Sequence, residues 1–178
     1  MNKTLFLCLL FAIVASSCSY KKDKLSEESS AAINTIAVII DDQLWNGEVG
    51  DSIRNKFASP VLGLPQEEPL FTINQYPVKL FEGFSTDSRN IIIVKKGNET
   101  KFEIKENEFS APQNAVHIIG KSTTEIIALL EENAHSIIQK MRKIEIAQNQ
   151  KIFRDSLLDT KKIQKKFNID LLIPSKYE

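Results

Sequence analysis

The sequence predicts an α+β (mixed α/β) protein, in which a mixed β-sheet of about five strands has helices packed on it. Two short apolar runs rich in β-branched residues, at 35–40 and 91–94, are typical of strands buried inside a sheet. From Ser122 onward, apolar residues recur at steps of three and four, which indicates one long helix near residues 122–150. These observations predict a buried sheet and a long helix that covers it.

Shorter patterns predict the remaining elements. Residues 43–58 are expected to form a helix with Asp42 as its N-cap, and Gly50 would allow another backbone to approach closely. Residues 101–105 alternate apolar and charged side chains after a Gly-Asn turn, which predicts a hairpin with the strand at 91–94. Further strands are expected at 115–119 and 169–173, and a shorter helix at 155–167.

The long helix has a recognisable beginning and one apolar face. Ser122 and Glu125 have the spacing of a capping box. The face predicted to meet the core or a partner consists of Ile127, Leu130, Ala134, Ile137, Met141 and Ile144.

The segment 59–84 is the least regular part of the sequence. It holds four prolines and four aromatic residues, and we expect a long loop here. Long loops inside compact domains are uncommon and are often functional.

The N-terminal residues have the pattern of a secretory signal. One lysine is followed by an apolar run at 5–14 and by small residues at 15–17, directly before Cys18. This order resembles a bacterial lipobox, in which Cys18 is lipidated and becomes the first residue after cleavage. An ordinary secretory signal with a chance cysteine is the alternative.

The chain is therefore predicted to have three parts. Residues 1–17 form a signal peptide, 18–33 the lipidated cysteine and a flexible tether, and 34–178 a mixed α/β domain. The final expected strand ends close to the C-terminus, and we therefore expect that the domain is truncated there. We expect a cell-envelope protein held in the outer membrane by acyl chains on Cys18, on its periplasmic or its surface-exposed side.

Charge and cysteine content exclude several classes of function. Lysine plus arginine equals aspartate plus glutamate, 23 of each, so no basic excess is available to bind nucleic acid. After cleavage Cys18 is the only cysteine, which excludes a disulfide, a thiolate zinc site and a cysteine nucleophile. No cofactor is expected. Four lysines between 161 and 166 are interpreted as a solvated helix end, with contact to anionic lipid head groups as the alternative.

Two sets of residues are candidates for a site. Asp41 and Asp42 follow the first buried strand, where carboxylates bind Mg²⁺ in many α/β folds, although the favoured interpretation is that Asp42 caps the helix and Asp41 is solvated. Trp45, Phe71 and Tyr76 are candidate partner-binding residues, with a core position for Trp45 as the alternative. No catalytic residue is assigned.

Two stretches resemble a known family. Trp45-Asn46-Gly47-Glu48 and Gly63-Leu64-Pro65-Gln66, together with the lipobox, resemble a Bacteroidetes lipoprotein family, domain of unknown function 4837. The resemblance implies a cell-envelope lipoprotein and supplies no established activity. It also implies that the chain matches the N-terminal part of longer family members.

The sequence supports two hypotheses of function. The first is a non-catalytic binding or assembly module anchored in the envelope, with a protein partner contacting residues 60–84 and the Trp45 region. The alternative is a metal-dependent envelope hydrolase that uses Asp41 and Asp42.

Overall fold

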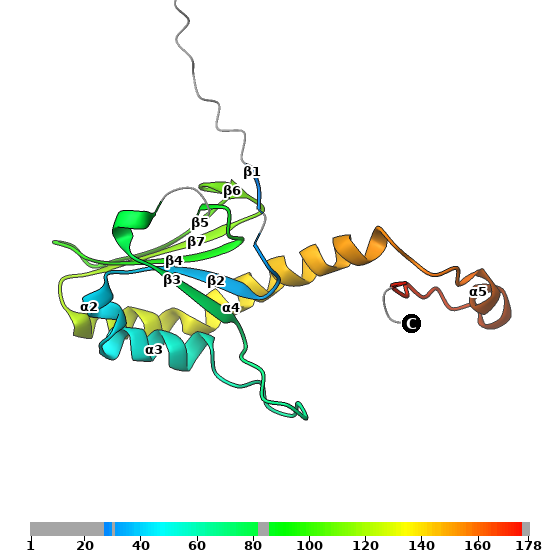
Figure 1. The fold of residues 1–178 in the computed structure, drawn as a ribbon, viewed down its shortest axis with the longest axis horizontal. Helices are drawn as coiled ribbons and strands as arrows, with labels where there is room; N and C mark the ends of the chain where they lie inside the picture. The colour runs from blue at the N-terminus through cyan, green and yellow to red at the C-terminus, as the bar shows by residue number, and fades with distance from the viewer. Residues whose placement is uncertain (1–26, 30, 82–85, 176–178) are drawn as a thin grey trace, which may run out of the picture.

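The computed structural model describes residues 27–29, 31–81 and 86–175. The predicted signal peptide and Cys18 lie outside the described residues. Figure 1 shows a sheet with helices beneath it, of which one is long and extends beyond the sheet. The strands are β1 (Glu27–Glu28), β2 (Thr35–Ile39), β3 (Thr72–Tyr76), β4 (Asn90–Lys96), β5 (Lys101–Glu106), β6 (Ser110–Ala111) and β7 (Asn114–Gly120). The helices are α2 (Asp42–Trp45), α3 (Glu48–Phe57), α4 (Thr123–Arg154), α5 (Lys161–Phe167) and the 3₁₀ turn η1 (Val78–Leu80).

The main sheet confirms the predicted mixed α+β class. Its five strands lie in the order β3-β2-β4-β7-β5, and all neighbours are parallel except β5, which is antiparallel to β7. The strands β1 and β6 form a separate parallel pair of two residues each. The parallel strands β2 and β4 have apolar residues on both faces, as strands in the middle of a covered sheet must, and β7 is buried except at His117 and Ile119.

The structure corrects one strand prediction and one loop prediction. The expected hairpin between residues 91–94 and 101–105 does not form, because β7 lies between β4 and β5. β7 is almost wholly buried, whereas β5 has exposed charges, so β5 takes the edge. The segment 59–84 is also not wholly a loop, since it contains β3, a half-exposed edge strand paired with β2.

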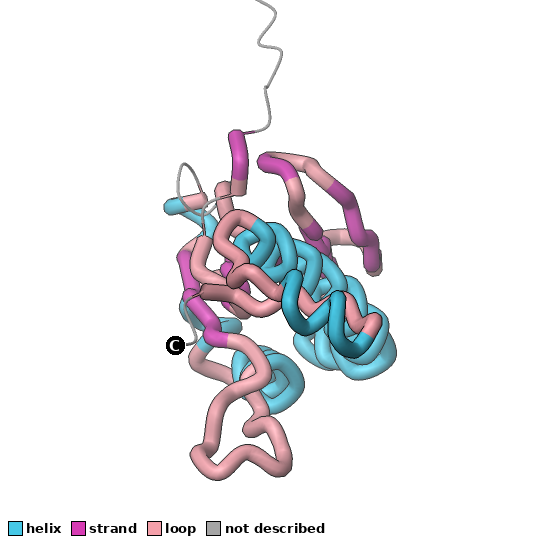
Figure 2. Tube along the Cα trace, turned by 90° about the vertical axis from the view of Figure 1, so that its right-hand side faces the viewer, coloured by secondary structure: helices cyan, strands magenta, loops and turns pink. Residues whose placement is uncertain are grey.

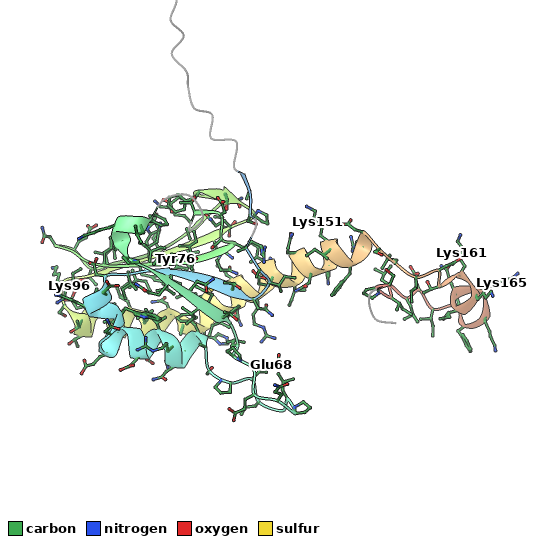
Figure 3. All side chains as sticks on the ribbon, viewed as in Figure 1. Glu68, Tyr76, Lys96, Lys151, Lys161 and Lys165 are labelled. Carbon is green, nitrogen blue, oxygen red and sulfur yellow. The ribbon has the colours of Figure 1, made fainter. Side chains whose placement is uncertain are left out.

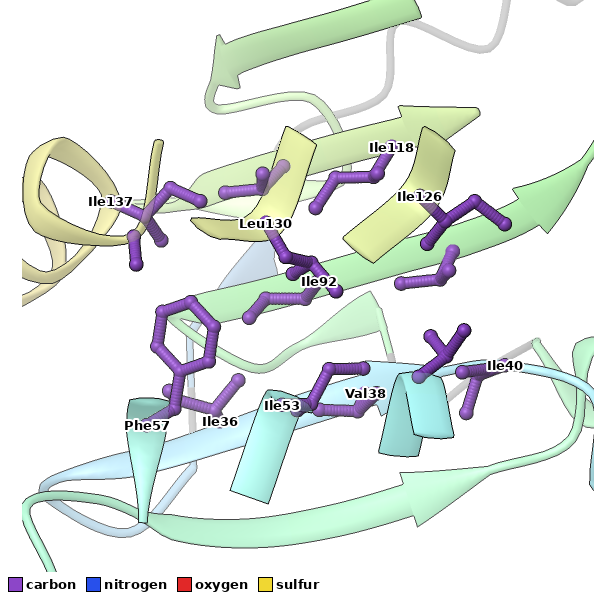
Figure 4. Close-up of a cluster of buried hydrophobic side chains, with 14 of the residues drawn as sticks. Ile36, Val38, Ile40, Ile53, Phe57, Ile92, Ile118, Ile126, Leu130 and Ile137 are labelled. Carbon is purple, nitrogen blue, oxygen red and sulfur yellow. The ribbon is translucent and has the colours of Figure 1, made fainter. Parts of the chain in front are cut away.

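The main core lies between the sheet and the helices α3 and α4. Alternate residues of the central strands point toward these helices, and Figure 4 shows them meeting Ile53, Phe57 and Leu130. The sheet side contributes Ile36, Val38, Ile40, Ile92, Val94, Val116 and Ile118. All of these side chains are buried, so α3 and α4 are held by apolar packing along most of the sheet.

The opposite face of the sheet has a smaller core, and none of the α-helices in the described ranges covers it. Ala37, Ile39, Ile91 and Ile93 are covered there by Tyr76, Val78, Phe81 and Phe109. The rings of Phe81 and Phe109 meet edge to face, with 5.1 Å between centroids. A short turn and two loops thus cover this face of the sheet.

The predicted helix at 43–58 is two helices. α2 ends at Trp45 and α3 begins at Glu48, with Gly47 as the N-cap of α3. Gly50 explains the tight junction, because a Cβ atom there would lie 1.8 Å from the carbonyl oxygen of Trp45. The expected N-cap was also wrong: Asp41 holds that position, and Asp42 is the first helical residue.

The long helix α4 begins as predicted. The Oγ of Ser122 accepts a hydrogen bond from the backbone N–H of Glu125, which confirms the cap. Its buried face differs from the predicted one at both ends. Ile126 is buried where Ile127 was expected, and Glu145 is buried where Ile144 was expected. The buried residues are Ile126, Leu130, Ala134, Ile137, Met141 and Glu145. The last nine residues, 146–154, continue past the sheet (Figure 1).

The C-terminal predictions are only partly met. The helix expected at 155–167 is α5, which begins at Lys161 and ends at Asn168 in the left-handed conformation. The strand expected at 169–173 was wrong, since this segment lies beyond the end of α4, away from any edge of the main sheet (Figure 1).

A buried ion pair fixes α4 to the start of the sheet. Arg89 and Glu145 have side chains 3% and 2% exposed, and their two hydrogen bonds measure 3.0 and 3.2 Å. Glu145 also accepts from the side chain of Asn90 and from the backbone N–H of Asn34, each at 2.8 Å. Arg89 donates further to the carbonyl of Ala32 at 2.9 Å. The pair thus joins α4, β4 and the segment before β2.

Removing one member of this pair is expected to destabilise the protein strongly. Arg89→Met leaves the Glu145 carboxylate buried without its cation, which costs about 3–5 kcal/mol in free energy of unfolding. The double variant Arg89→Met/Glu145→Leu is expected to recover part of this loss, because it removes both charges. Urea unfolding measures both values.

The matched control is the exposed ion pair between Lys140 and Glu106, 2.8 Å apart. Lys140→Met is expected to cost less than about 1 kcal/mol, because water screens this pair. An equal cost for Arg89→Met and Lys140→Met would contradict the structural role given to the buried pair.

Candidate functional site

Asp41 and Asp42 lie at the carboxyl end of β2 and are both exposed. The carbonyl of Asp41 accepts from the N–H groups of Leu44 and Trp45, at 3.0 Å each, which begins α2. One carboxylate oxygen of Asp42 accepts from the side-chain amide of Gln75 at 3.2 Å. In the described ranges, no group of three or more Asp, Glu, His or Cys side chains is placed to hold a metal ion.

The three aromatic candidates do not form one surface. Trp45 is partly buried against the main core, and the guanidinium of Arg54 lies 4.5 Å from the centre of its ring. Tyr76 lies on the opposite face of the sheet, where it covers the smaller core (labelled in Figure 3). Phe71 precedes β3 at the other end of the strand and is only 1% exposed. Phe71 is therefore a core residue, and its assignment to a partner-binding surface was wrong.

A different part of the segment 59–84 projects from the domain as a loop. The loop between α3 and β3 is closed at its base, where the N–H groups of Leu70 and Val61 donate to the carbonyls of Ser59 and Glu68 at 2.9 and 2.8 Å. Its tip turns at Gly63, whose φ of +90° favours glycine. Figures 1 and 2 show this loop extending away from the sheet, on the same side as α3 and α4. The paired base holds the tip in position.

A hollow of about 300 Å³ separates this loop from α4, and we call it the loop groove. Phe71 and Glu145 line it, and both are buried, so the main core and the ion pair form its floor. Its walls are Asn34, Val61, Leu64, Glu68, Pro69, Leu70, Arg142, Ile146 and Asn149. The groove therefore depends on the network that fixes α4 to the sheet.

Four exposed apolar side chains, which we call the apolar rim, lie in or beside the loop groove. Val61, Leu62 and Leu64 come from the loop, and Ile146 comes from the uncovered part of α4. Leu62 is 95% exposed, although the chain buries Ile and Val side chains fully elsewhere. Clustered exposed apolar residues of this kind mark contact surfaces in soluble domains. Their sequence signal is three apolar residues between Pro60 and Pro65, and the aromatic pattern of this segment does not indicate them.

A second hollow lies on the other side of α4. It has a volume of about 570 Å³ and lies between the β5–β7 connection and the helix, with Gln113, Asn114 and Ile144 in its lining. Lys140 and Glu106, which also line it, are paired with each other. This hollow is larger than the loop groove, and the apolar rim does not border it.

The charged side chains on one face of β5 and β7 form ion pairs with one another. Burial raises the pKa of Glu108, but hydrogen bonds from His117 and Lys105 outweigh burial and hold that pKa below its ordinary value. The same contact with Glu108 raises the pKa of Lys105. This arrangement is a set of neighbouring ion pairs at the edge of the sheet, and Glu103 extends it.

The fold defines a class: an α+β domain with helices on one face of a mixed sheet and a cluster of exposed apolar side chains at one end. Residues 29–154 match the family Domain of unknown function (DUF8532), and the chain belongs to that family. The match does not confirm the resemblance to domain of unknown function 4837. Neither a curated protein nor a solved structure matches the chain. Among the described residues, no helix is long and apolar enough to cross a membrane.

A pair of substitutions separates core from rim in the segment 59–84. Phe71→Ala is expected to lower the free energy of unfolding by about 3–5 kcal/mol, because it removes a buried ring. Leu62→Ala is expected to change it by less than about 0.5 kcal/mol, because the side chain is exposed. Urea unfolding of both variants checks this, and a costly Leu62→Ala would place Leu62 in the core.

Proposed function

We propose that the protein is a lipid-anchored cell-envelope lipoprotein that binds a protein partner without catalysing a reaction. The observation that carries the binding role is the apolar rim around the loop groove. Its four side chains are exposed together on a loop with a paired base and on a helix fixed by a buried ion pair. A contact surface held in advance loses little conformational entropy on binding.

The loop groove also indicates the chemistry of the partner. Leu62, Val61 and Leu64 would pack against apolar side chains, as in the centre of a protein interface. Glu67 and Glu68 follow them in the same loop and are exposed, so the partner is expected to carry basic residues beside its apolar ones. We infer a partner segment that combines apolar and basic side chains.

The anchoring role rests on the N-terminal sequence. The lysine, the apolar run, the small residues and Cys18 follow one another in the order of a lipobox. Outer-membrane location and a relation to domain of unknown function 4837 are part of the same proposal, supported by this order and by the Trp-Asn-Gly-Glu stretch at 45–48. Two or three acyl chains would anchor the domain stably, where one would not.

Lipidation can be measured directly. The full chain, produced in a Gram-negative bacterium fed a clickable fatty acid, is expected to take up the label and to sediment with membranes. Cys18→Ser is expected to lose the label, whereas Cys8→Ser is expected to keep it, because Cys8 lies inside the signal peptide. Equal labelling of both variants would contradict lipidation at Cys18.

Partner binding can be tested by photo-crosslinking in the cells that make the protein. A crosslinking amino acid at Leu62 is expected to capture one recurrent protein. The same amino acid at Leu80, which is 64% exposed on the opposite face, is expected not to capture it. Equal products from Leu62 and Leu80 would contradict a specific surface.

A second substitution shows whether the loop groove itself is used. Ile146→Asp places a charge in the α4 wall of the groove, which Val61 and Leu64 also line, and is expected to reduce the Leu62 crosslink by about tenfold, since a buried unpaired charge is costly. Ile152→Asp, less than two turns further along α4, is the matched control and is expected to leave the crosslink unchanged.

A further inference from the structure

Residues 156–175 form a small closed unit at the end of α4, which we call the distal lobe. Its two ends are joined by hydrogen bonds from Leu158 N–H to the carbonyl of Ile173 at 2.9 Å and from Ser175 N–H to the carbonyl of Ser156 at 3.0 Å. The hydroxyl of Thr160 donates to the carbonyl of Leu171 at 3.0 Å inside the lobe. The lobe therefore has a defined shape of its own, with α5 at its far end (Figure 1).

The distal lobe presents apolar side chains to solvent. Phe167 and Leu172 are 58% and 59% exposed, and Ile169 and Leu171 are also exposed. None of the four belongs to either core cluster of the described residues. A unit of twenty residues has too little core to bury these side chains itself, so they remain available for another surface.

The same lobe concentrates positive charge. Lys161, Lys162, Lys165 and Lys166 are all exposed, against two aspartates in the lobe, in a chain whose net charge is zero. Over the described part of the chain, no carboxylate forms an ion pair with any of these four lysines. The positive charge is therefore not neutralised within the lobe.

Position makes this surface accessible. The last nine residues of α4 carry the lobe clear of the sheet, and Figure 3 shows Lys161 and Lys165 at its outer end. The lobe also lies outside the family match, which ends at residue 154, where α4 ends. The family domain and the distal lobe are thus distinct parts of the chain.

We propose that the distal lobe binds the surface of an anionic lipid membrane. Exposed apolar side chains insert at the boundary between head groups and acyl chains, and lysines beside them attract anionic head groups. Phe167 and the leucines supply the first interaction and the four lysines supply the second. A lipid surface adapts to protruding side chains, whereas a protein partner would need a matching recess. This contact is independent of lipidation at Cys18.

Vesicle sedimentation tests the proposal on a chain of residues 19–178, which lacks the signal peptide and Cys18. This chain keeps the whole core, because the buried apolar residues lie between Ile36 and Met141. It is expected to bind vesicles of phosphatidylethanolamine with phosphatidylglycerol and not vesicles of phosphatidylcholine alone. Binding is expected to weaken as salt is raised. Equal binding to both kinds of vesicle, or to neither, would overturn the proposal.

Charge variants locate the contact. Lys161→Glu/Lys165→Glu is expected to weaken binding to anionic vesicles by at least about tenfold, from the usual contribution of a lysine near such a surface. Lys95→Glu/Lys96→Glu, at the exposed end of β4, makes the same change of charge elsewhere and is expected to have little effect. Equal losses in both double variants would mean that only net charge matters, which would overturn a site in the lobe.

Apolar variants test insertion separately. Phe167→Ser/Leu172→Ser is expected to weaken vesicle binding severalfold without changing the melting temperature of the domain, because neither residue is in a core cluster. Leu62→Ser/Leu80→Ser is the matched control and is expected to bind as the parent chain does. If lobe variants bind vesicles as well as the parent chain, the lobe does not contact lipid, and a protein surface becomes the occupant to seek.

Discussion

The buried pair of Arg89 and Glu145 is the interaction on which the rest of the structure depends. Apolar packing alone would let α4 slide or rotate on the sheet, since its stripe of branched and small residues meets a similar apolar surface. The carboxylate of Glu145 accepts hydrogen bonds from Arg89, Asn90 and the backbone of Asn34, which sets one position for the helix. The buried charge of this carboxylate is tolerated because its oxygens accept these hydrogen bonds.

This pair also decides where exposed apolar surface remains. It lies at the last point where α4 touches the sheet, so the helix is covered before Glu145 and uncovered after it. The loop groove forms at this boundary, with Glu145 in its floor and Ile146 in its wall. The distal lobe is held further out by the same helix. Two exposed apolar surfaces of different charge, one with acidic neighbours and one with lysines, therefore follow from the position of α4.

Local patterns were sufficient wherever one stretch of chain decides its own structure. The buried strands at 35–40, 91–94 and 115–119 were predictable from their apolar β-branched residues, and the start of α4 from Ser122 and Glu125. The pairing of the strands was not predictable, because it depends on which strands occupy the central positions of the sheet. β7 displaced the expected hairpin because nearly all of its residues are buried, whereas β5 has exposed charges. β3 was overlooked because an edge strand carries polar residues.

The sequence by itself determined the α+β class, the long helix and the absence of a basic excess, since these depend on composition and on local periodicity. Only the tertiary structure decided that Phe71 is buried and Leu62 exposed, because both lie in one irregular segment where no period indicates which side faces the core. It also decided that Glu145, a charged residue, belongs to the buried face of α4. A carboxylate is buried only where hydrogen-bond donors lie beside it. The donors here, Arg89 and Asn90, are more than 50 residues away in the chain.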